Sequence, residues 1–196
     1  MTMKILNMLW IILILVIILI RRYHMKKAGS QTSLKDTPAL EAVLMLLWSV
    51  SACAIPVIFV FSDWLAFANY PFRIHWILKI TGICIFILSI WLLHRSHVDL
   101  GRMWSIKVEP EKKGKLVEDG VYKRMRHPMY TAHLIWGVAQ LLIFPNFIAG
   151  PSALIMFYII IRLRIPREEK ALMEQFGDDY KRYVLRTGCI FPRIVD

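Results

Sequence analysis

Hydrophobic residues gather into three long runs along the chain, separated by polar and mostly basic segments. The runs cover residues 5–20, 39–61 and 74–93, and each contains at most one charged side chain. A helix needs about 20 predominantly apolar residues to cross the hydrocarbon core of a bilayer. The pattern therefore predicts three membrane-spanning helices, with a kink at Pro56 in the second.

A fourth apolar region, residues 131–165, is interrupted by two pairs of turn-forming residues. Pro145-Asn146 and Gly150-Pro151 predict a helical hairpin with arms of about fifteen residues. Each arm would reach only about 22 Å, which is less than the roughly 30 Å of a hydrocarbon core. We therefore expect a hairpin that is partly re-entrant or leans against the other helices.

The second arm of the hairpin predicts a long helix that continues through Pro166 into the C-terminal tail. Leu172, Phe176, Tyr180 and Tyr183 recur at spacings of three and four, which favours one shared helical face. We expect this helix to break at Thr187-Gly188. The predicted fold class is an all-α integral membrane protein with about five transmembrane helices. Residues 1–94 would form three N-terminal transmembrane helices, and residues 95–196 a cytoplasmic loop, the hairpin and a C-terminal helix.

Composition agrees with a membrane protein, because 57% of the residues are hydrophobic. Cys53, Cys84 and Cys189 form no C-x-x-C pair, so we expect neither a disulfide framework nor a metal site. The first apolar run is followed by Arg21-Arg22 and not by a small-residue cleavage site. We therefore expect a retained anchor and not a cleaved signal peptide.

Basic residues account for a net charge of +11, and their placement predicts the orientation of the chain. Residues 21–38, 95–130 and 162–196 hold 22 of the 25 lysines and arginines. The positive-inside rule puts these three segments on the cytoplasmic side and the N-terminus outside. The outer loop, residues 62–73, then carries an aromatic belt: Trp64, Phe67, Tyr70 and Phe72, followed by Trp76. Cytoplasmic flanks explain the charge, so we expect no nucleic-acid partner.

Two polar segments on the cytoplasmic side could carry chemistry, although each also has a simpler explanation. Arg162, Arg164, Arg167, Glu168 and Glu169 suit an interfacial anchor, and His127-Pro128 suits the start of a helix. His94 and His97 are spaced as a weak metal pair, but without carboxylate or cysteine companions a solvated helix end is favoured. A short hairpin joins the two segments, so they must lie close together. Together they supply the groups of a polar pocket at a membrane surface.

Both segments carry motifs of a known family. "LVEDGVYKRMRHPMY" followed by "RLRIPREEKALMEQFGDDYKRY" resembles the isoprenylcysteine carboxyl methyltransferase family over residues 95–192. The matching positions are Leu116-Val117, Gly120, Tyr122, Arg126-His127-Pro128, Tyr130, Arg164, Glu168, Phe176-Gly177 and Tyr180. The chain departs from the family at Gly114-Lys115, where a histidine is frequent, and at Lys107, where a glutamine is common. Cofactor contacts there are expected to differ or to be made by the backbone.

The resemblance implies methyl transfer from S-adenosyl-L-methionine to the C-terminal carboxylate of a prenylated cysteine, with S-adenosyl-L-homocysteine as the product. It also implies catalytic roles for Arg164, which would bind the substrate carboxylate, and Glu168, which would also touch the cofactor. Arg162 and Arg167 would point to other sectors of the helix. The partners would be membrane lipids and a prenylated or similar lipid substrate that enters from the bilayer, and no metal. The implied cofactor-binding residues are Leu116, Val117, Tyr122, His127, Pro128, Met129, Tyr130 and Glu168.

Elementary chemistry agrees with this implication but is also compatible with different functions. A carboxylate is ionised at neutral pH, so its methylation needs no general base. The planar guanidinium of Arg164 can hold a carboxylate by two parallel bonds. A phospholipid N-methyltransferase shares the cofactor motif, although its amine substrate would be repelled by Arg164. A membrane reductase that uses NADPH is a further possibility, for which the sequence has no glycine-rich fingerprint, and so is a non-catalytic membrane scaffold.

Overall fold

The computed structural model describes residues 2–28, 38–71, 75–101 and 115–193, which fold into helices and connecting loops. The described residues contain no β-strand element, only two isolated bridges. This confirms the prediction of an all-α fold. The α-helices are α1 (Thr2–Ala28), α2 (Ala39–Ser49), α3 (Ile55–Phe61), α4 (Trp76–Leu100), α5 (Pro128–Ile143), α6 (Ser152–Phe176) and α7 (Asp178–Arg186).

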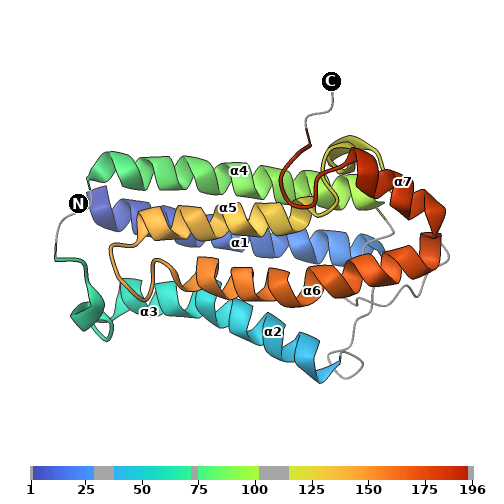
Figure 1. The fold of residues 1–196 in the computed structure, drawn as a ribbon. Helices are drawn as coiled ribbons and strands as arrows, with labels where there is room; N and C mark the ends of the chain where they lie inside the picture. The colour runs from blue at the N-terminus through green and yellow to red at the C-terminus, as the bar shows by residue number, and fades with distance from the viewer. Residues whose placement is uncertain (1, 29–37, 72–74, 102–114, 194–196) are drawn as a thin grey trace.

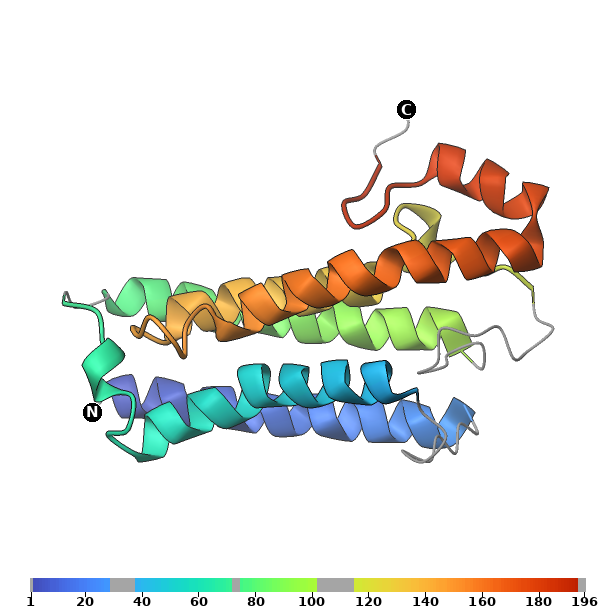
Figure 2. The same ribbon diagram turned by 60° about the horizontal axis from the view of Figure 1, so that its bottom comes forward.

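The long helices lie side by side as a bundle of two layers (Figures 1 and 2). α1 and the combined α2–α3 form one layer, and α4, α5 and α6 form the other. Aromatic rings meet in the core, where Trp10 of α1 packs on Phe86 of α4 and, edge to face, on Phe144, which follows α5. Trp10 and Phe144 are both fully buried. The N-terminal helices and the hairpin therefore share one core.

Three helices are long and apolar enough to cross a membrane: Ile5–Lys27, Ala39–Phe61 and Trp76–Leu100. They confirm the three predicted spans. α4 runs six residues into the segment expected to be a loop from residue 95 onward. α5 has 16 residues, close to the expected arm of the hairpin. α6 has 25 residues and is longer than the expected arm, because it continues through Pro166 as predicted. The fourth and fifth spans, and the division into residues 1–94 and 95–196, stay predictions.

Pro56 marks a π-helical turn, Val50–Ala54, between α2 and α3. In a π-helix the N–H of each residue donates to the carbonyl five residues earlier. Pro56 has no N–H, so the carbonyl of Ser51 receives no such bond. Side chains of the hairpin supply the bonds: Gln140 Nε2 donates to Ser51 O at 3.1 Å and Ser152 Oγ donates at 2.8 Å. The predicted irregularity at Pro56 thus joins the second span to α5 and α6.

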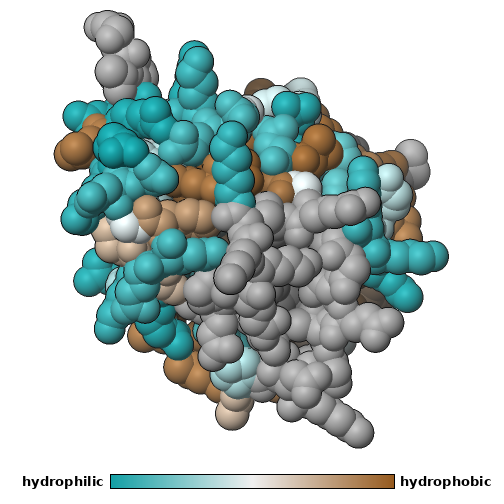
Figure 3. Space-filling view, turned by 90° about the vertical axis from the view of Figure 1, so that its right-hand side faces the viewer, coloured by the Kyte–Doolittle hydropathy of each residue, from teal (hydrophilic) through white to brown (hydrophobic). Residues whose placement is uncertain are grey.

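The two ends of the bundle differ in character. At one end, Trp64, Phe67 and Trp76 are at least half exposed, as expected of an aromatic belt; Phe72 lies outside the described residues. The described parts of all three basic segments lie at the other end, on the right in Figure 1. Side chains described on that face are mostly hydrophilic (Figure 3). This clustering agrees with the prediction that the three basic segments lie on the same side of the membrane.

One prediction about the C-terminal helix is wrong. The chain turns at Gly177, whose φ of 53° lies in the left-handed region where glycine is favoured, so α6 ends at Phe176 and α7 begins at Asp178. Leu172 and Phe176 therefore lie on a different helix from Tyr180 and Tyr183. Local periodicity could not reveal a turn that preserves the spacing of apolar residues. The predicted break at Thr187-Gly188 is confirmed, because α7 ends at Arg186 and Thr187 is extended.

Candidate functional site

The loop after α4 is anchored by an acid at the end of that helix. Asp99 accepts a hydrogen bond from the backbone N–H of Val121 at 2.9 Å and pairs with Arg95 at 2.9 Å. Gly120, next to Val121, has φ of 60°, and a Cβ there would lie 2.1 Å from Asp99 Oδ2. Only glycine meets both demands, because it tolerates this φ and leaves room for the carboxylate. The glycine of the motif is thus explained by the local fold.

The C-terminal tail lines up beside the Arg126-His127 segment and holds it by backbone bonds. Arg126 N donates to Gly188 O at 2.8 Å, and His127 N donates to Cys189 O at 3.0 Å. Gly188 N in turn donates to Arg124 O at 3.1 Å. Segments about 60 residues apart in sequence therefore form one short ladder. The ladder fixes where the side chains of Arg126 and His127 point.

Both of these side chains meet Glu169 of α6. Arg126 Nε donates to Glu169 Oε1 at 2.8 Å, and His127 Nε2 lies 3.3 Å from the same oxygen. Because a carboxylate only accepts, Nε2 of His127 carries the hydrogen. The hydrogen bond from His127 lowers the pKa of Glu169, and the hydrogen bond and charge of Arg126 lower it further. Burial has the opposite effect but is outweighed, so the pKa is about 2. Glu169 is therefore ionised at neutral pH, and the interfacial-anchor interpretation does not describe it.

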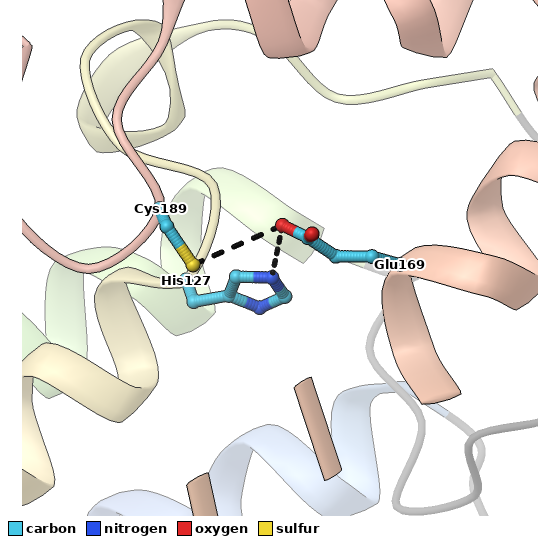
Figure 4. A group of neighbouring side chains, drawn as sticks. All are labelled: His127, Glu169 and Cys189. Carbon is cyan, nitrogen blue, oxygen red and sulfur yellow. Dashed lines mark hydrogen bonds and ion pairs between the residues drawn. The ribbon is translucent and has the colours of Figure 1, made fainter. Parts of the chain in front are cut away.

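Cys189 completes a group that has the spacing of metal ligands (Figure 4). Its Sγ lies 3.8 Å from Glu169 Oε1, and the ligand atoms of His127, Glu169 and Cys189 all lie within 4.8 Å of one another. Arg126 already places a positive charge on the shared oxygen. Burial raises the pKa of the Cys189 thiol. We interpret the group as an ion-pair network that fixes the loop.

The neighbouring acid, Glu168, joins the two predicted motifs. The phenol of Tyr130 donates to Glu168 Oε1 at 2.5 Å, and Arg164 Nη2 lies 3.2 Å from the same oxygen. His127 Nδ1 lies 3.7 Å from the other oxygen, Oε2. The structure therefore brings together four of the predicted site residues: His127, Tyr130, Arg164 and Glu168. It does so where α5 begins and the apolar part of α6 ends.

Sequence reasoning missed an acid of α2 that takes part in this cluster. Glu41 is 3% exposed, and its Oε2 lies 3.2 Å from Arg164 Nη1. Its Oε1 lies 3.6 Å from Arg167 Nη1, so the expectation that Arg167 points to an unrelated sector of the helix is wrong. A signal was present, because an ionisable residue inside an apolar span is a functional-site candidate by default.

Of the two histidines expected at a solvated helix end, His94 is exposed as expected, but His97 is not. His97 is 1% exposed and stacks on His24 of α1 with ring centroids 5.0 Å apart, so it does not lie at a solvated helix end. His133 Nδ1 lies 2.6 Å from the Met129 carbonyl, which only accepts, so Nδ1 carries the hydrogen. Nε2 of His133 then accepts from Arg21 at 3.2 Å. Packing of α1 against α4 and α5 decided these contacts, which no local motif signals.

The rest of the predicted cofactor residues lie apart from the Glu168 cluster or serve the fold. Tyr122 is buried, and its carbonyl accepts from Tyr183 at 2.7 Å, which ties the loop to α7. Pro128 is the first residue of α5, and Met129 packs against the main core. Val117 is half-buried. Leu116 lines a surface pocket of about 340 Å³ together with Lys115, Glu118, Phe176, Asp179, Arg182 and Arg186. Lys107 and Gly114 lie outside the described residues.

Comparison with known families confirms the resemblance that the two motifs indicate. Residues 81–174 match the "Isoprenylcysteine carboxyl methyltransferase (ICMT) family". The matched range begins within α4, includes the whole hairpin and ends shortly before the end of α6. It contains the residues that meet at Glu168, except for Glu41 of α2.

Curated relatives carry the corresponding enzyme name. The chain is 34% identical over 120 residues to protein-S-isoprenylcysteine O-methyltransferase B of Arabidopsis thaliana, covering 60% of this chain and 61% of that protein. It is 30% identical over 141 residues to the protein-S-isoprenylcysteine O-methyltransferase of Tribolium castaneum, covering 68% and 50%. The Homo sapiens enzyme is 29% identical over 124 residues, covering 62% and 43%. The chain thus spans about three fifths or less of the length of these relatives.

A solved structure shows that the fold itself is shared. It is the structure of the eukaryotic intramembrane Ras methyltransferase ICMT (isoprenylcysteine carboxyl methyltransferase) without a monobody. The TM-score is 0.56 at 23% sequence identity, and the match covers 88% of this chain and 63% of that one. The likeness extends beyond residues 81–174, so it includes N-terminal helices as well as the hairpin.

Proposed function

We propose that this protein, whose residues 81–174 match the isoprenylcysteine carboxyl methyltransferase family, is an S-adenosylmethionine-dependent carboxyl O-methyltransferase. Its proposed substrate is the C-terminal carboxylate of a prenylated cysteine or a similar membrane-borne lipid acid. The proposed orientation places the Glu168 end of the bundle and the C-terminus in the cytoplasm and the N-terminus outside. The observation that carries the proposal is the convergence of Tyr130, His127 and Arg164 on Glu168.

Side chains at this end fit a cofactor that carries positive charge. S-adenosylmethionine has a sulfonium and an ammonium group, which favour nearby acids. Glu168 lies beside His127 and Tyr130, and the low pKa of Glu169 keeps a second carboxylate ionised next to the same turn. We propose that Glu168, with His127 and Tyr130, holds the cofactor. Leu116 would contribute from the surface pocket that it lines.

The reaction needs no proton transfer by the protein, but it needs accurate positioning of the substrate carboxylate. When bound, the cofactor supplies the methyl group: a substrate oxygen gains the C–O bond as the C–S bond breaks, and the bonding electron pair stays on sulfur. The carboxylate is already ionised, so no side chain has to accept a proton. The task of Arg164 is to orient that carboxylate, and burial suits it because its side chain is only 13% exposed. A desolvated guanidinium fixes two oxygens with the planar geometry that the attack requires.

The position of Arg164 also suits a substrate with a prenyl chain. Arg164 follows the apolar part of α6, in which Ile155, Ile159 and Leu163 are exposed. In a bilayer these exposed side chains face lipid, so a prenyl chain can lie beside them while its cysteine carboxylate reaches Arg164. A water-soluble cofactor would approach from the polar end, where the loop and the tail meet. The two reactants can thus meet without either crossing the whole membrane.

A transfer assay with purified protein tests the proposal. Detergent-purified protein is given methyl-labelled S-adenosylmethionine and either N-acetyl-S-farnesylcysteine or phosphatidylethanolamine. We expect label in the farnesylcysteine, released as methanol by mild alkali because it is an ester. Label in the phospholipid that resists alkali would instead identify an N-methyltransferase. Binding of NADPH without binding of S-adenosylhomocysteine would identify a reductase, and binding of neither would contradict any methyl transfer.

A further inference from the structure

Glu41 is a buried acid in the first turn of α2, at the start of an apolar span. It is the only charged residue in the sequence of residues 39–61, and in the structure it is buried between α2 and α6. One carboxylate oxygen faces Arg164 at 3.2 Å, and the other faces Arg167 at 3.6 Å. A buried carboxylate is costly unless cations compensate it, so these two arginines hold it there. Glu41 thus occupies one side of the guanidinium that is proposed to bind substrate.

Both terminal nitrogens of Arg164 face internal carboxylates. Nη1 faces Glu41 at 3.2 Å and Nη2 faces Glu168 at 3.2 Å. A substrate carboxylate that is held by two parallel bonds needs two of the N–H groups along one edge of the guanidinium. A third carboxylate beside two others would also be repelled by them. Withdrawal of one of the two internal acids would relieve this repulsion and free N–H groups for the substrate.

The contacts decide which acid withdraws. Glu168 is one turn from Arg164 on the same helix and accepts a 2.5 Å hydrogen bond from Tyr130, so it is fixed. Glu41 belongs to a different helix, and its second oxygen already faces Arg167. Glu41 can move toward Arg167, whose side chain is 42% exposed, and still keep one positively charged partner. Glu41 is thus the acid that can be exchanged.

We infer that Glu41 is an exchangeable counter-ion of Arg164: it pairs with the guanidinium while the site is empty or holds the ester product, and it gives way to a carboxylate substrate. The inference rests on the proposed function. A substrate carboxylate replaces Glu41 with a group of equal charge, so Arg164 keeps a partner. A methyl ester carries no charge and cannot do so. Glu41 therefore pairs with Arg164 again after methyl transfer, and the product is released.

Steady-state kinetics of two variants with opposite expected effects test the inference. In Glu41→Gln the competing charge is absent, so KM for N-acetyl-S-farnesylcysteine should fall by at least about threefold. Affinity for the corresponding methyl ester, measured as product inhibition, should change less than about twofold. In Arg167→Gln, Glu41 keeps only Arg164 as a positively charged partner. Displacing Glu41 from Arg164 then costs more free energy, so KM for the acid should rise. Glu174→Gln is the matched control, because Glu174 is an exposed acid of α6 that pairs only with Lys170 among the described residues.

Each contrary outcome overturns the inference. A fall in kcat for Glu41→Gln with KM unchanged would mean that Glu41 merely positions Arg164. Equal tightening of acid and ester would mean a general loosening of α2. If Glu41→Gln does not fold, an unchanged or lower KM in Arg167→Gln contradicts the inference alone. If the wild-type protein neither methylates nor binds the acid, the proposed function fails first and the inference with it.

Discussion

The phenol of Tyr130 donates to Glu168 Oε1 at 2.5 Å, which joins the first residues of α5 to α6. The two residues are 38 positions apart in sequence. Tyr130 belongs to the loop motif and Glu168 to the helix motif, so this one bond connects the two halves of the proposed site. It also positions the carboxylate that faces Arg164.

Removing this connection should weaken cofactor binding without unfolding the protein. Tyr130→Phe deletes only the hydroxyl, and a hydrogen bond to a charged group contributes about 1.5–3 kcal/mol, so we expect S-adenosylhomocysteine affinity to fall by about tenfold or more. His127→Ala should have a similar effect. Calorimetric titration measures the affinity, and thermal unfolding serves as the folding control. Lower stability with unchanged affinity in both variants would leave these residues only a helix-start role.

Arg164→Lys should separate a carboxylate-binding arginine from a membrane anchor. Lysine keeps the charge but lacks the planar fork, so we expect turnover to fall by at least about tenfold, or roughly 1.4 kcal/mol of transition-state stabilisation, with cofactor affinity nearly unchanged. Arg162 is exposed on the same helix and provides the matched control. Equal turnover of the Arg164→Lys and Arg162→Lys variants would show that Arg164 is an anchor.

Glu169 should make stability depend on pH in the acid range. Its pKa is lowered from 4.5 to about 2 in the folded protein, so its contribution is fully present above about pH 4.5 and is lost as the pH falls toward 2. Glu169→Gln should therefore lower the melting temperature at pH 7, and the difference from wild type should shrink below pH 4.5. Melting curves from about pH 3 to 7 measure this. A difference that stays constant across the range would mean that the charge of Glu169 does not stabilise the fold.

Gly120→Ala should destabilise the protein through both backbone strain and a clash. The φ of 60° disfavours any side chain, and the new Cβ would meet the Asp99 carboxylate. We expect the free energy of unfolding to fall by about 1–3 kcal/mol. Gly177→Ala is the control, because φ is 53° there but nothing lies within 4 Å of an added Cβ. Equal effects of the two substitutions would mean that the contact with Asp99 contributes nothing.

The orientation of the chain can be tested by labelling single cysteines in intact cells. With Cys53, Cys84 and Cys189 replaced, Phe67→Cys should react with a membrane-impermeant maleimide, whereas Lys27→Cys should react only after permeabilisation. Both wild-type side chains are exposed in the structure, so access is not limited by the fold. Protection of position 67 together with labelling of position 27 would reverse the proposed orientation.

Sequence by itself determined the features that depend on local length, periodicity and turn chemistry. Apolar run length located the three spans, and Pro145 and Gly150 located the turn of the hairpin. The two motifs located Glu168 and the three residues that meet at it. These features are local because each is set by a few neighbouring residues and by the thickness of a bilayer.

Tertiary structure alone decided the partners of the charged residues. The pairing of Glu41 with Arg164 joins helices that are far apart in sequence, and the pairing of Arg126 with Glu169 depends on the ladder between the loop and the tail. The turn at Gly177 likewise redirected a helix whose apolar spacing continued without a break. Ion pairs form wherever packing brings opposite charges into a region of low dielectric, and the spacing along the chain does not encode that packing.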